Sequence, residues 1–352
     1  KELKKFPNIS LDFIGSGIAL EQAKLSNCFE NYYLCDTNEF KDLKKYEKNF
    51  KNYDVYLSSE NINGAIFALQ NDLKNTYYID NLMWMWDKIP EELCNVKKYF
   101  ISEIIPCKSN FERIGNQIKN PIFVGPIRNI STKKCKSINQ LIINIGGAES
   151  FLLNNSLIIK FYNKLINDIL SDNLINKFSS IVICGGSGVI NNITINNESK
   201  KIKKCTLSHE HYLKEMEKST HCILASGLGN FIETIGRSKN IMYLPAINYS
   251  QLQQIEYYKE QNFGFKILNW TDFSFYKKIP KYLDEESGVN MVVSNIKKYL
   301  DDDYMKIVNN KINEFINENQ ENFFGSRKKY LNKFSKNASK DIAKIIYNDN
   351  KR

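Results

Sequence analysis

Short apolar runs rich in β-branched and aromatic residues alternate with stretches of helical periodicity along the first part of the chain. The runs predict strands at residues 10–15, 32–36, 54–58, 76–80, 99–104 and 121–127. Between them, stretches such as INGAIFALQNDL (residues 62–73) have the periodicity of a helix. Strands that alternate with helices are typical of right-handed βαβ units, and therefore of a parallel sheet.

The alternation stops at a polar, lysine-bearing segment, residues 128–140, and then starts again. The second series predicts strands at 141–147, 180–186, 203–208, 221–227 and 240–246, with a helix at 153–170. We therefore expect an α/β protein with two Rossmann-like, doubly wound domains that face a cleft. In such sheets, ligands bind beyond the carboxyl ends of the strands.

The C-terminal tail has apolar residues at a spacing of four, which predicts one amphipathic helix. These residues are Tyr330, Phe334, Ala338, Ile342 and Ile346. We expect an N-terminal domain at residues 1–136, a C-terminal domain at 137–320, and a tail at 321–352 whose helix packs back on the domains.

Length and composition agree with this organisation. A chain of 352 residues with 42% hydrophobic content is too long for one ordinary domain and can bury two cores. Apolar runs stay well short of the roughly 20 residues that span a bilayer, and residues 1–10 are charged where a secretory signal would become apolar. We expect a soluble, cytoplasmic protein, and the sequence does not indicate its oligomeric state.

The net charge of +10 raises the question of a nucleic-acid partner. The charges are dispersed and mostly lysine, which is typical of solvated helix faces, so we do not expect one. A basic nucleic-acid binding protein remains the non-enzymatic alternative. The eight cysteines form no CxxC pair. His209 and His211, which with His221 are the only histidines, have no third ligand at a zinc-site spacing, so we expect no metal.

The stretch LASGLGNFIETIG, residues 224–236, combines a glycine turn with a helix start. Ser226, Gly227 and Gly229 follow the strand predicted at its beginning, and a helix is expected to open at Asn230. The first N–H groups of a helix lack intrahelical partners, and glycines let a phosphate approach them. Glu233, one turn on, is placed to accept hydrogen bonds from ribose hydroxyls. An ordinary turn with a solvated glutamate is the alternative reading.

Residues 226–254 resemble the donor-binding domain of GT-B glycosyltransferases, most of all the lipid-linked N-acetylglucosamine transferases of glycosyltransferase family 28. The elements that carry the resemblance are Ser226-Gly227, Glu233, Leu244-Pro245 and Gln253-Gln254. Weaker similarity extends to residues 143–150, 183–188 and 124–127. About half of the chain is covered.

The resemblance implies a donor-binding C-terminal domain, an acceptor-binding N-terminal domain, a nucleotide-sugar donor that is most simply a UDP-sugar, and a small-molecule acceptor. It implies no further cofactor and no metal. The residues implied to contact the donor are Gly146, Gly147, Gly185, Ser208, His209, Ser226, Gly227, Leu228, Gly229, Asn230, Glu233, Gln253 and Gln254, with Gly15, Ser16 and Gly17 forming a short glycine turn in the first domain.

The first domain departs from the family because it has no histidine before His209. An inverting transfer needs a base, and a carboxylate is then the obvious choice. Asp80 ends a predicted strand and Asp87 follows it, so we predict that one of them is the catalytic base. Asp80 as a cap of the next segment, or a retaining mechanism without a base, are the alternatives.

Trp84 and Trp86 lie beside these carboxylates, either as core residues or as a surface that stacks on a planar acceptor. This segment faintly resembles cytosylglucuronate synthases, which implies a nucleobase such as cytosine as the acceptor. A nucleotide-sugar hydrolase or epimerase of the same fold is the enzymatic alternative.

Overall fold

The computed structural model describes residues 1–127, 137–149, 152–334 and 338–351, so most of the polar segment predicted at 128–140 lies outside the described residues. The chain divides into two compact units. Unit 1 comprises Lys1–Ile130 and Asn332–Arg352, and unit 2 comprises Ser131–Leu331.

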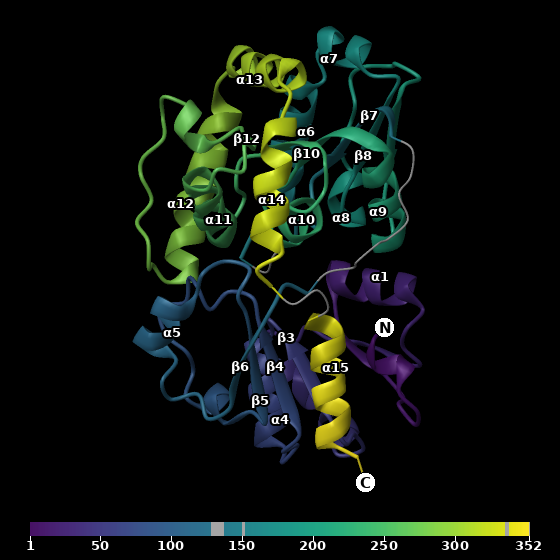
Figure 1. The fold of residues 1–352 in the computed structure, drawn as a ribbon, viewed down its shortest axis with the longest axis vertical. Helices are drawn as coiled ribbons and strands as arrows, with labels where there is room; N and C mark the ends of the chain where they lie inside the picture. The colour runs from purple at the N-terminus through teal and green to yellow at the C-terminus, as the bar shows by residue number, and fades with distance from the viewer. Residues whose placement is uncertain (128–136, 150–151, 335–337, 352) are drawn as a thin grey trace. The chain divides into compact units, whose positions relative to one another are not determined.

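Unit 1 contains the six strands expected from the first hydrophobic series (Figure 1). A parallel pair is formed by β1 (Phe13–Gly15) and β2 (Tyr32–Leu34), and a four-stranded parallel sheet has the order β3 (Tyr56–Ser59), β4 (Thr76–Asp80), β5 (Lys98–Ser102) and β6 (Pro121–Val124). The helices of unit 1 are η1 (Leu3–Lys5), α1 (Gly17–Ser26), α2 (Phe40–Leu43), η2 (Lys44–Tyr46), α3 (Glu47–Phe50), α4 (Ile62–Gln70), η3 (Glu92–Asn95), α5 (Lys108–Ile114) and α15 (Ala338–Asp349).

The buried β4 strand shows how unit 1 is layered. Side chains alternate between the two faces of a strand, and Tyr77 and Ile79 belong to the cluster that includes Ala338, Ile342 and Ile346 of α15. Tyr78 belongs to a separate cluster with Ala65 of α4. The chain therefore returns at its C-terminal end to cover one face of the first sheet.

The prediction of one continuous tail helix from Tyr330 onward is wrong, because the tail forms two helices. Helix α14 (Phe324–Leu331) ends in unit 2, and α15 begins only at Ala338. Tyr330 is held on unit 2 by the hydrogen bond between its hydroxyl and that of Tyr257, at 2.6 Å. The regular spacing therefore spans two helices that pack on different cores.

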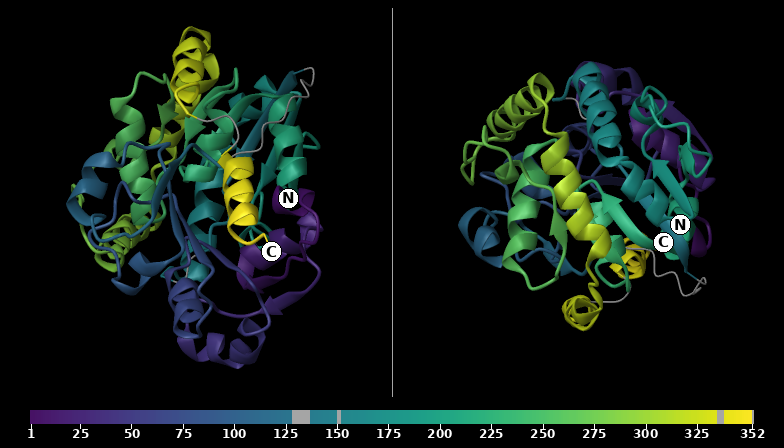
Figure 2. Two further views of the ribbon diagram at one scale, coloured as in Figure 1. Left: turned by 60° about the horizontal axis from the view of Figure 1, so that its bottom comes forward. Right: turned by 90° about the horizontal axis from the view of Figure 1, so that it is seen from above.

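Unit 2 is a single six-stranded parallel sheet with helices around it (Figures 1 and 2). Its strands are β7 (Ile138–Asn144), β8 (Ser180–Cys184), β9 (Ile202–Cys205), β10 (Ser219–Leu224), β11 (Asn240–Tyr243) and β12 (Lys266–Ile267). Its helices are α6 (Asn155–Ile169), α7 (Asp172–Lys177), α8 (Ser187–Ile190), α9 (His209–Lys218), α10 (Leu228–Thr234), α11 (Tyr249–Glu260), η4 (Trp270–Asp272), α12 (Glu285–Asp301), α13 (Met305–Asn317), η5 (Glu321–Phe323) and α14.

The strand order of unit 2, β12-β11-β10-β7-β8-β9, defines a topological switch point. From β7 the chain proceeds through β8 to β9 in one direction, whereas from β10 it proceeds through β11 to β12 in the other. Right-handed crossovers therefore place α6 and α10 on opposite faces of the sheet. The neighbouring carboxyl ends of β7 and β10, where Asn144 pairs with Leu224, are the place where this topology opens a binding site.

His221 in β10 is enclosed by hydrogen-bonding and aromatic partners in unit 2. Gln320 donates its N–H to Oδ1 of Asn240, which orients the Asn240 amide so that Nδ2 faces Nε2 of His221 at 3.0 Å. The imidazole must accept this bond, and it lies between Phe178 and Phe315. Burial lowers the pKa of His221 to about 4.

We expect unit 2 to lose stability as the pH falls from about 6.5 to 4, because the unfolded chain binds a proton to this histidine before the folded one does. His221→Gln should reduce that loss by up to about 3 kcal/mol. His211→Gln, at an exposed position of α9, is the control. Urea unfolding at a series of pH values measures the difference, and equal pH dependence in wild type and His221→Gln would contradict the assignment.

Candidate functional site

Three turns meet at the switch point of unit 2. Asn144, the last residue of β7, accepts a hydrogen bond through Oδ1 from Gly146 N at 2.8 Å. Gly146 has a φ of +70°, which favours glycine, and its carbonyl accepts a bond from Gly186 N at 2.8 Å. A Cβ on Gly146 would lie only 3.6 Å from that of Ala225. The turns after β7, β8 and β10 are therefore in contact.

The glycine after β8 is required by this packing. A Cβ on Gly185 would lie 2.3 Å from Cγ1 of Ile145, and one on Gly186 would lie 2.4 Å from the carbonyl oxygen of Gly147. The close approach of two turns therefore accounts for the missing side chain of Gly185, and its contact with the donor stays a prediction.

The turn after β10 leaves open space. Ser226 is fully buried, and its Oγ has no hydrogen-bond partner among the described residues. A Cβ on Gly229 would meet no atom within 4 Å, and one on Gly227 would meet only Nε2 of Gln251, at 3.8 Å. Such a turn, with a buried hydroxyl and unfilled space beside its glycines, has the features of a ligand cradle.

Two details of this turn differ from the prediction. Helix α10 begins at Leu228 rather than at Asn230, and Gly227 occupies the N-cap position with a φ of −68°. Neither Gly227 nor Gly229 has a positive φ. The requirement for glycine here is therefore spatial and not conformational.

Asn230 is predicted to contact the donor, but its side-chain amide is hydrogen-bonded to other residues of the protein. Its Nδ2 donates to the Ala225 carbonyl at 2.9 Å, while its Oδ1 accepts from Asn144 Nδ2 at 3.1 Å and from the Tyr212 hydroxyl at 2.9 Å. Its side chain is buried. Asn230 and Asn144 thus hold α10, α9 and the β7 turn together, and the sequence signal for this role is an asparagine within two residues of a turn glycine, Gly229 or Gly146.

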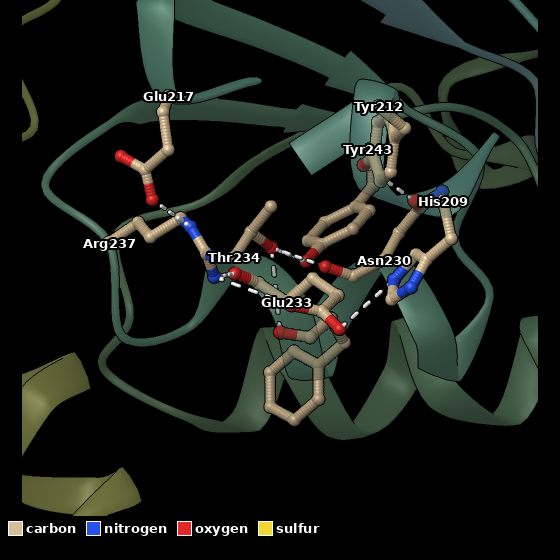
Figure 3. Close-up of polar contacts among 9 residues, drawn as sticks. His209, Tyr212, Glu217, Asn230, Glu233, Thr234, Arg237 and Tyr243 are labelled. Carbon is tan, nitrogen blue, oxygen red and sulfur yellow. Dashed lines mark hydrogen bonds and ion pairs between the residues drawn. The ribbon is translucent and has the colours of Figure 1, made fainter. Parts of the chain in front are cut away.

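Glu233 lies between a basic partner on each side (Figure 3). Its Oε1 is 3.3 Å from Nε2 of His209, and its Oε2 is 3.5 Å from Nη1 of Arg237, which also donates to the Glu233 carbonyl. Arg237 in turn donates through Nε to Glu217 at 2.6 Å. Glu233 is therefore a buried, ion-paired residue that keeps one side toward the His209 imidazole, whose side chain is 54% exposed.

The carboxyl end of β9 supplies the neighbouring part of the site. Ser208 accepts through Oγ from the N–H of His211 and is the N-cap of α9. Two residues earlier, Thr206 has a buried Oγ1 without a hydrogen-bond partner among the described residues. The ends of β9 and β10 therefore each carry a buried hydroxyl that no described residue satisfies.

Helix α11 presents a residue that the sequence analysis did not single out. Gln251 accepts through Oε1 from Ile247 N at 3.0 Å, and this bond orients its amide nitrogen toward Gly227. The predicted pair is more enclosed, with Gln253 8% and Gln254 2% exposed, and Gln254 accepts a long bond of 3.5 Å from the Tyr258 hydroxyl. Donor contacts of Gln253 and Gln254 remain a prediction.

The other predicted residues lie in unit 1. Gly15 ends β1, Ser16 is the N-cap of α1 and makes no side-chain capping bond, and Gly17 opens α1 with a φ of +54°. Asp87 is partly buried and accepts through Oδ1 from Lys88 N at 2.8 Å. All of these residues belong to unit 1.

Asp80 does not fit the role of catalytic base. It is 0% exposed, and its two carboxylate oxygens accept hydrogen bonds from Leu82 N at 2.6 Å, the Tyr99 hydroxyl at 2.8 Å and Trp86 Nε1 at 3.1 Å. Burial raises the pKa of Asp80 to about 6. A group that is sealed from solvent and fully engaged cannot meet an acceptor molecule, so Asp80 orders the loop after β4.

Among the described residues, no set of three or more His, Cys, Asp or Glu side chains is arranged to hold a metal ion. The helices formed by these residues are each too short or too polar to span a bilayer.

The sequence matches no protein-family model and no curated protein. Solved structures do match. A glycotransferase of kitacinnamycin has a TM-score of 0.55 at 9% identity, over 99% of this chain and 93% of that one. MurG of Acinetobacter baumannii has a TM-score of 0.51 at 12% identity, again over 99% and 93%. At these identities the likeness establishes the fold, and the predicted GT-B fold class, an α/β protein with parallel sheets, is confirmed.

Proposed function

We propose that the protein is a glycosyltransferase that moves a sugar from a nucleoside diphosphate, most simply UDP, to a small acceptor. The observation that carries the proposal is the turn Ser226–Gly229 at the switch point of unit 2, with its buried unsatisfied hydroxyl and the open space at its glycines. The two solved structures of the same fold are described as a glycotransferase and MurG, which supports the reaction class.

The donor diphosphate would lie at this turn. Open glycines allow a phosphate oxygen to approach the first N–H groups of α10, and the Ser226 hydroxyl can donate a further bond. The ribose would then lie toward Glu233 and His209, one helical turn away. Because a carboxylate accepts hydrogen bonds from two hydroxyls at once, Glu233 would discriminate a ribose from a deoxyribose.

We expect Glu233→Gln to weaken UDP binding by about 1.5–3 kcal/mol, as for the loss of a hydrogen bond to a charged group. It should also reduce the preference for UDP over 2′-deoxy-UDP, since the 2′-hydroxyl loses its charged acceptor. The sequence alone predicts an accessible glutamate whose removal hardly affects folding. Glu233 is instead buried and ion-paired with Arg237, so we expect a loss of about 1–3 kcal/mol in stability as well.

Glu217→Gln is the matched control, because Glu217 also binds Arg237 but does so from the far end of α9. Both variants should lose stability, whereas only the Glu233 variant should lose discrimination. Calorimetry with UDP and 2′-deoxy-UDP separates the two effects. Full discrimination in Glu233→Gln would show that Glu233 has a structural role only.

For the acceptor, we propose a planar nitrogen heterocycle such as cytosine. Trp84 and Trp86 are partly buried on the loop after β4, and Trp86 is fixed through its Nε1 by Asp80. Arg113 and Asn110 both donate to the Trp86 carbonyl, so two side chains of α5 tie the loop down. Incubation of UDP-sugars with and without cytosine, followed by product analysis, distinguishes transfer from hydrolysis or epimerisation.

A further inference from the structure

We infer that Glu60, at the carboxyl end of β3 in unit 1, is the carboxylate that takes the proton from the acceptor. The inference rests on the proposed transferase function and supplies the base that Asp80 cannot be. It follows from the backbone of Glu60, from the way Asn81 holds its carboxylate, and from unsatisfied oxygens at the same edge of the sheet.

Glu60 has an unusual backbone for its residue type. It follows directly after β3 with a φ of 61°, in the left-handed region that a glutamate rarely adopts, and its N–H donates to the Ile79 carbonyl at 3.1 Å. Its side chain is exposed. Strain of this kind persists where the surrounding structure enforces it, and it is concentrated at functional sites.

Asn81 fixes the direction of the carboxylate. Oε1 of Glu60 accepts from the backbone N–H of Asn81 at 2.6 Å and from its Nδ2 at 2.8 Å. A base must be oriented as well as accessible, because proton transfer requires hydrogen-bond geometry. Asn81 is therefore the positioning residue of this pair.

The same edge contains oxygens that the protein does not use. The buried Oδ1 of Asn81 and the Oγ of Ser102 have no hydrogen-bond partner among the described residues, and Ser102 is 0% exposed. Asp80 pairs with Ile101 in the sheet, so Asn81 and Ser102 follow at neighbouring positions. Buried polar atoms are normally satisfied, which indicates that a polar ligand with N–H or O–H donors belongs here.

The reaction balances with the residues and substrates named. The acceptor O–H or N–H gives its proton to Glu60, and the acceptor atom forms a bond to the anomeric carbon of the sugar. The bond from that carbon to the phosphate oxygen breaks, and UDP leaves with the electron pair. A single displacement of this kind inverts the anomeric configuration.

The test measures UDP release from UDP-glucose and UDP-glucuronate, with water alone and with cytosine as the acceptor. We expect Glu60→Gln to lower kcat by at least about 100-fold, the usual contribution of a general base, while the Kd for UDP is unchanged. In Glu60→Ala, added formate should restore part of the rate, because a small carboxylate can occupy the vacated position. A merely structural role predicts no such rescue.

Glu103→Gln is the matched control, since Glu103 follows β5 just as Glu60 follows β3, and its carboxylate forms a long ion pair of 4.0 Å with Lys108. It should retain turnover. Wild-type protein that binds UDP but releases none from either donor would overturn the transferase function together with this inference. Wild-type turnover that Glu60→Gln retains, or a loss that formate does not rescue, would overturn the role of Glu60 alone.

Discussion

Gly229→Val should abolish donor binding and leave the fold unchanged. A Cβ at Gly229 would meet no protein atom within 4 Å, so the valine side chain would project into the space that we assign to the phosphates. Valine in place of an exposed glycine of α10 does not weaken the helix. We expect UDP affinity to fall by at least about 100-fold, or about 2.7 kcal/mol.

The size of the side chain should set the size of the effect. Gly229→Ala should lose less affinity than Gly229→Val, and Gly229→Asp should lose more because its carboxylate repels a phosphate. Gly227→Val tests the same space from the N-cap, where its φ of −68° suits any residue. Calorimetry with UDP, together with the melting temperature of each variant, provides the measurement.

Gly325→Val is the matched control. Gly325 lies in α14, and a Cβ there would also meet no atom within 4 Å. The substitution is the same, and both glycines are exposed second residues of a helix, but Gly325 is distant in sequence from the turn. If Gly229→Val binds UDP as tightly as Gly325→Val does, the assignment of the phosphate turn is wrong.

The strands and their order of appearance were predictable because each is a short apolar run between polar turns. Residues 76–80, for example, are a strand in both the prediction and the structure. The break in the C-terminal tail was not predictable, because Tyr330 and Ala338 share a helical spacing although they pack on different cores. A local pattern reports which side of an element is apolar, and it does not report where the element ends or what it covers.

The candidate site shows the same division. The turn at Ser226 and Gly227 was predictable, because glycines after a strand are a local signal. The burial of Glu233 was not, since it depends on Arg237 and His209, and the latter comes from another helix. The position of Asp80 at a strand end was also correct, but its enclosure by Tyr99 and Trp86 could not be read from the sequence.

The largest effect on stability is expected from Arg327→Met in α14. The guanidinium is 0% exposed and donates to the carbonyls of Phe263 at 2.6 Å and Lys239 at 2.7 Å, and to Oε1 of Gln320 at 2.5 Å. It also lies over the ring of Phe265, 4.5 Å from the centroid. Burial lowers the pKa of Arg327 to about 10, so it stays charged at neutral pH.

Methionine fills part of the volume but removes the guanidinium donors from the Phe263 and Lys239 carbonyls, and it leaves Oε1 of Gln320 with the Ile241 N–H alone. Each unsatisfied buried acceptor costs about 1 kcal/mol or more, so we expect unit 2 to lose about 3 kcal/mol. The stability of Arg327→Lys should lie between those of the wild type and Arg327→Met. An ammonium keeps the charge but cannot reproduce the planar fork that reaches several acceptors at once. Lys328→Met, at the next and exposed position of the same helix, should change little.

Hydrogen exchange measures both where Arg327→Met loses stability and how large the loss is. Gln320 accepts from Ile241 N and donates to Ile241 O, both at 3.0 Å, so it extends the pairing of β11, and Arg327 holds Gln320 in place. Arg327→Met should therefore raise the exchange rate at the Ile241 amide and along α14, by about 100-fold for a loss of 2.7 kcal/mol. Unchanged exchange at Ile241, with global stability equal to that of Lys328→Met, would show that the buried guanidinium does not anchor α14 to the second sheet.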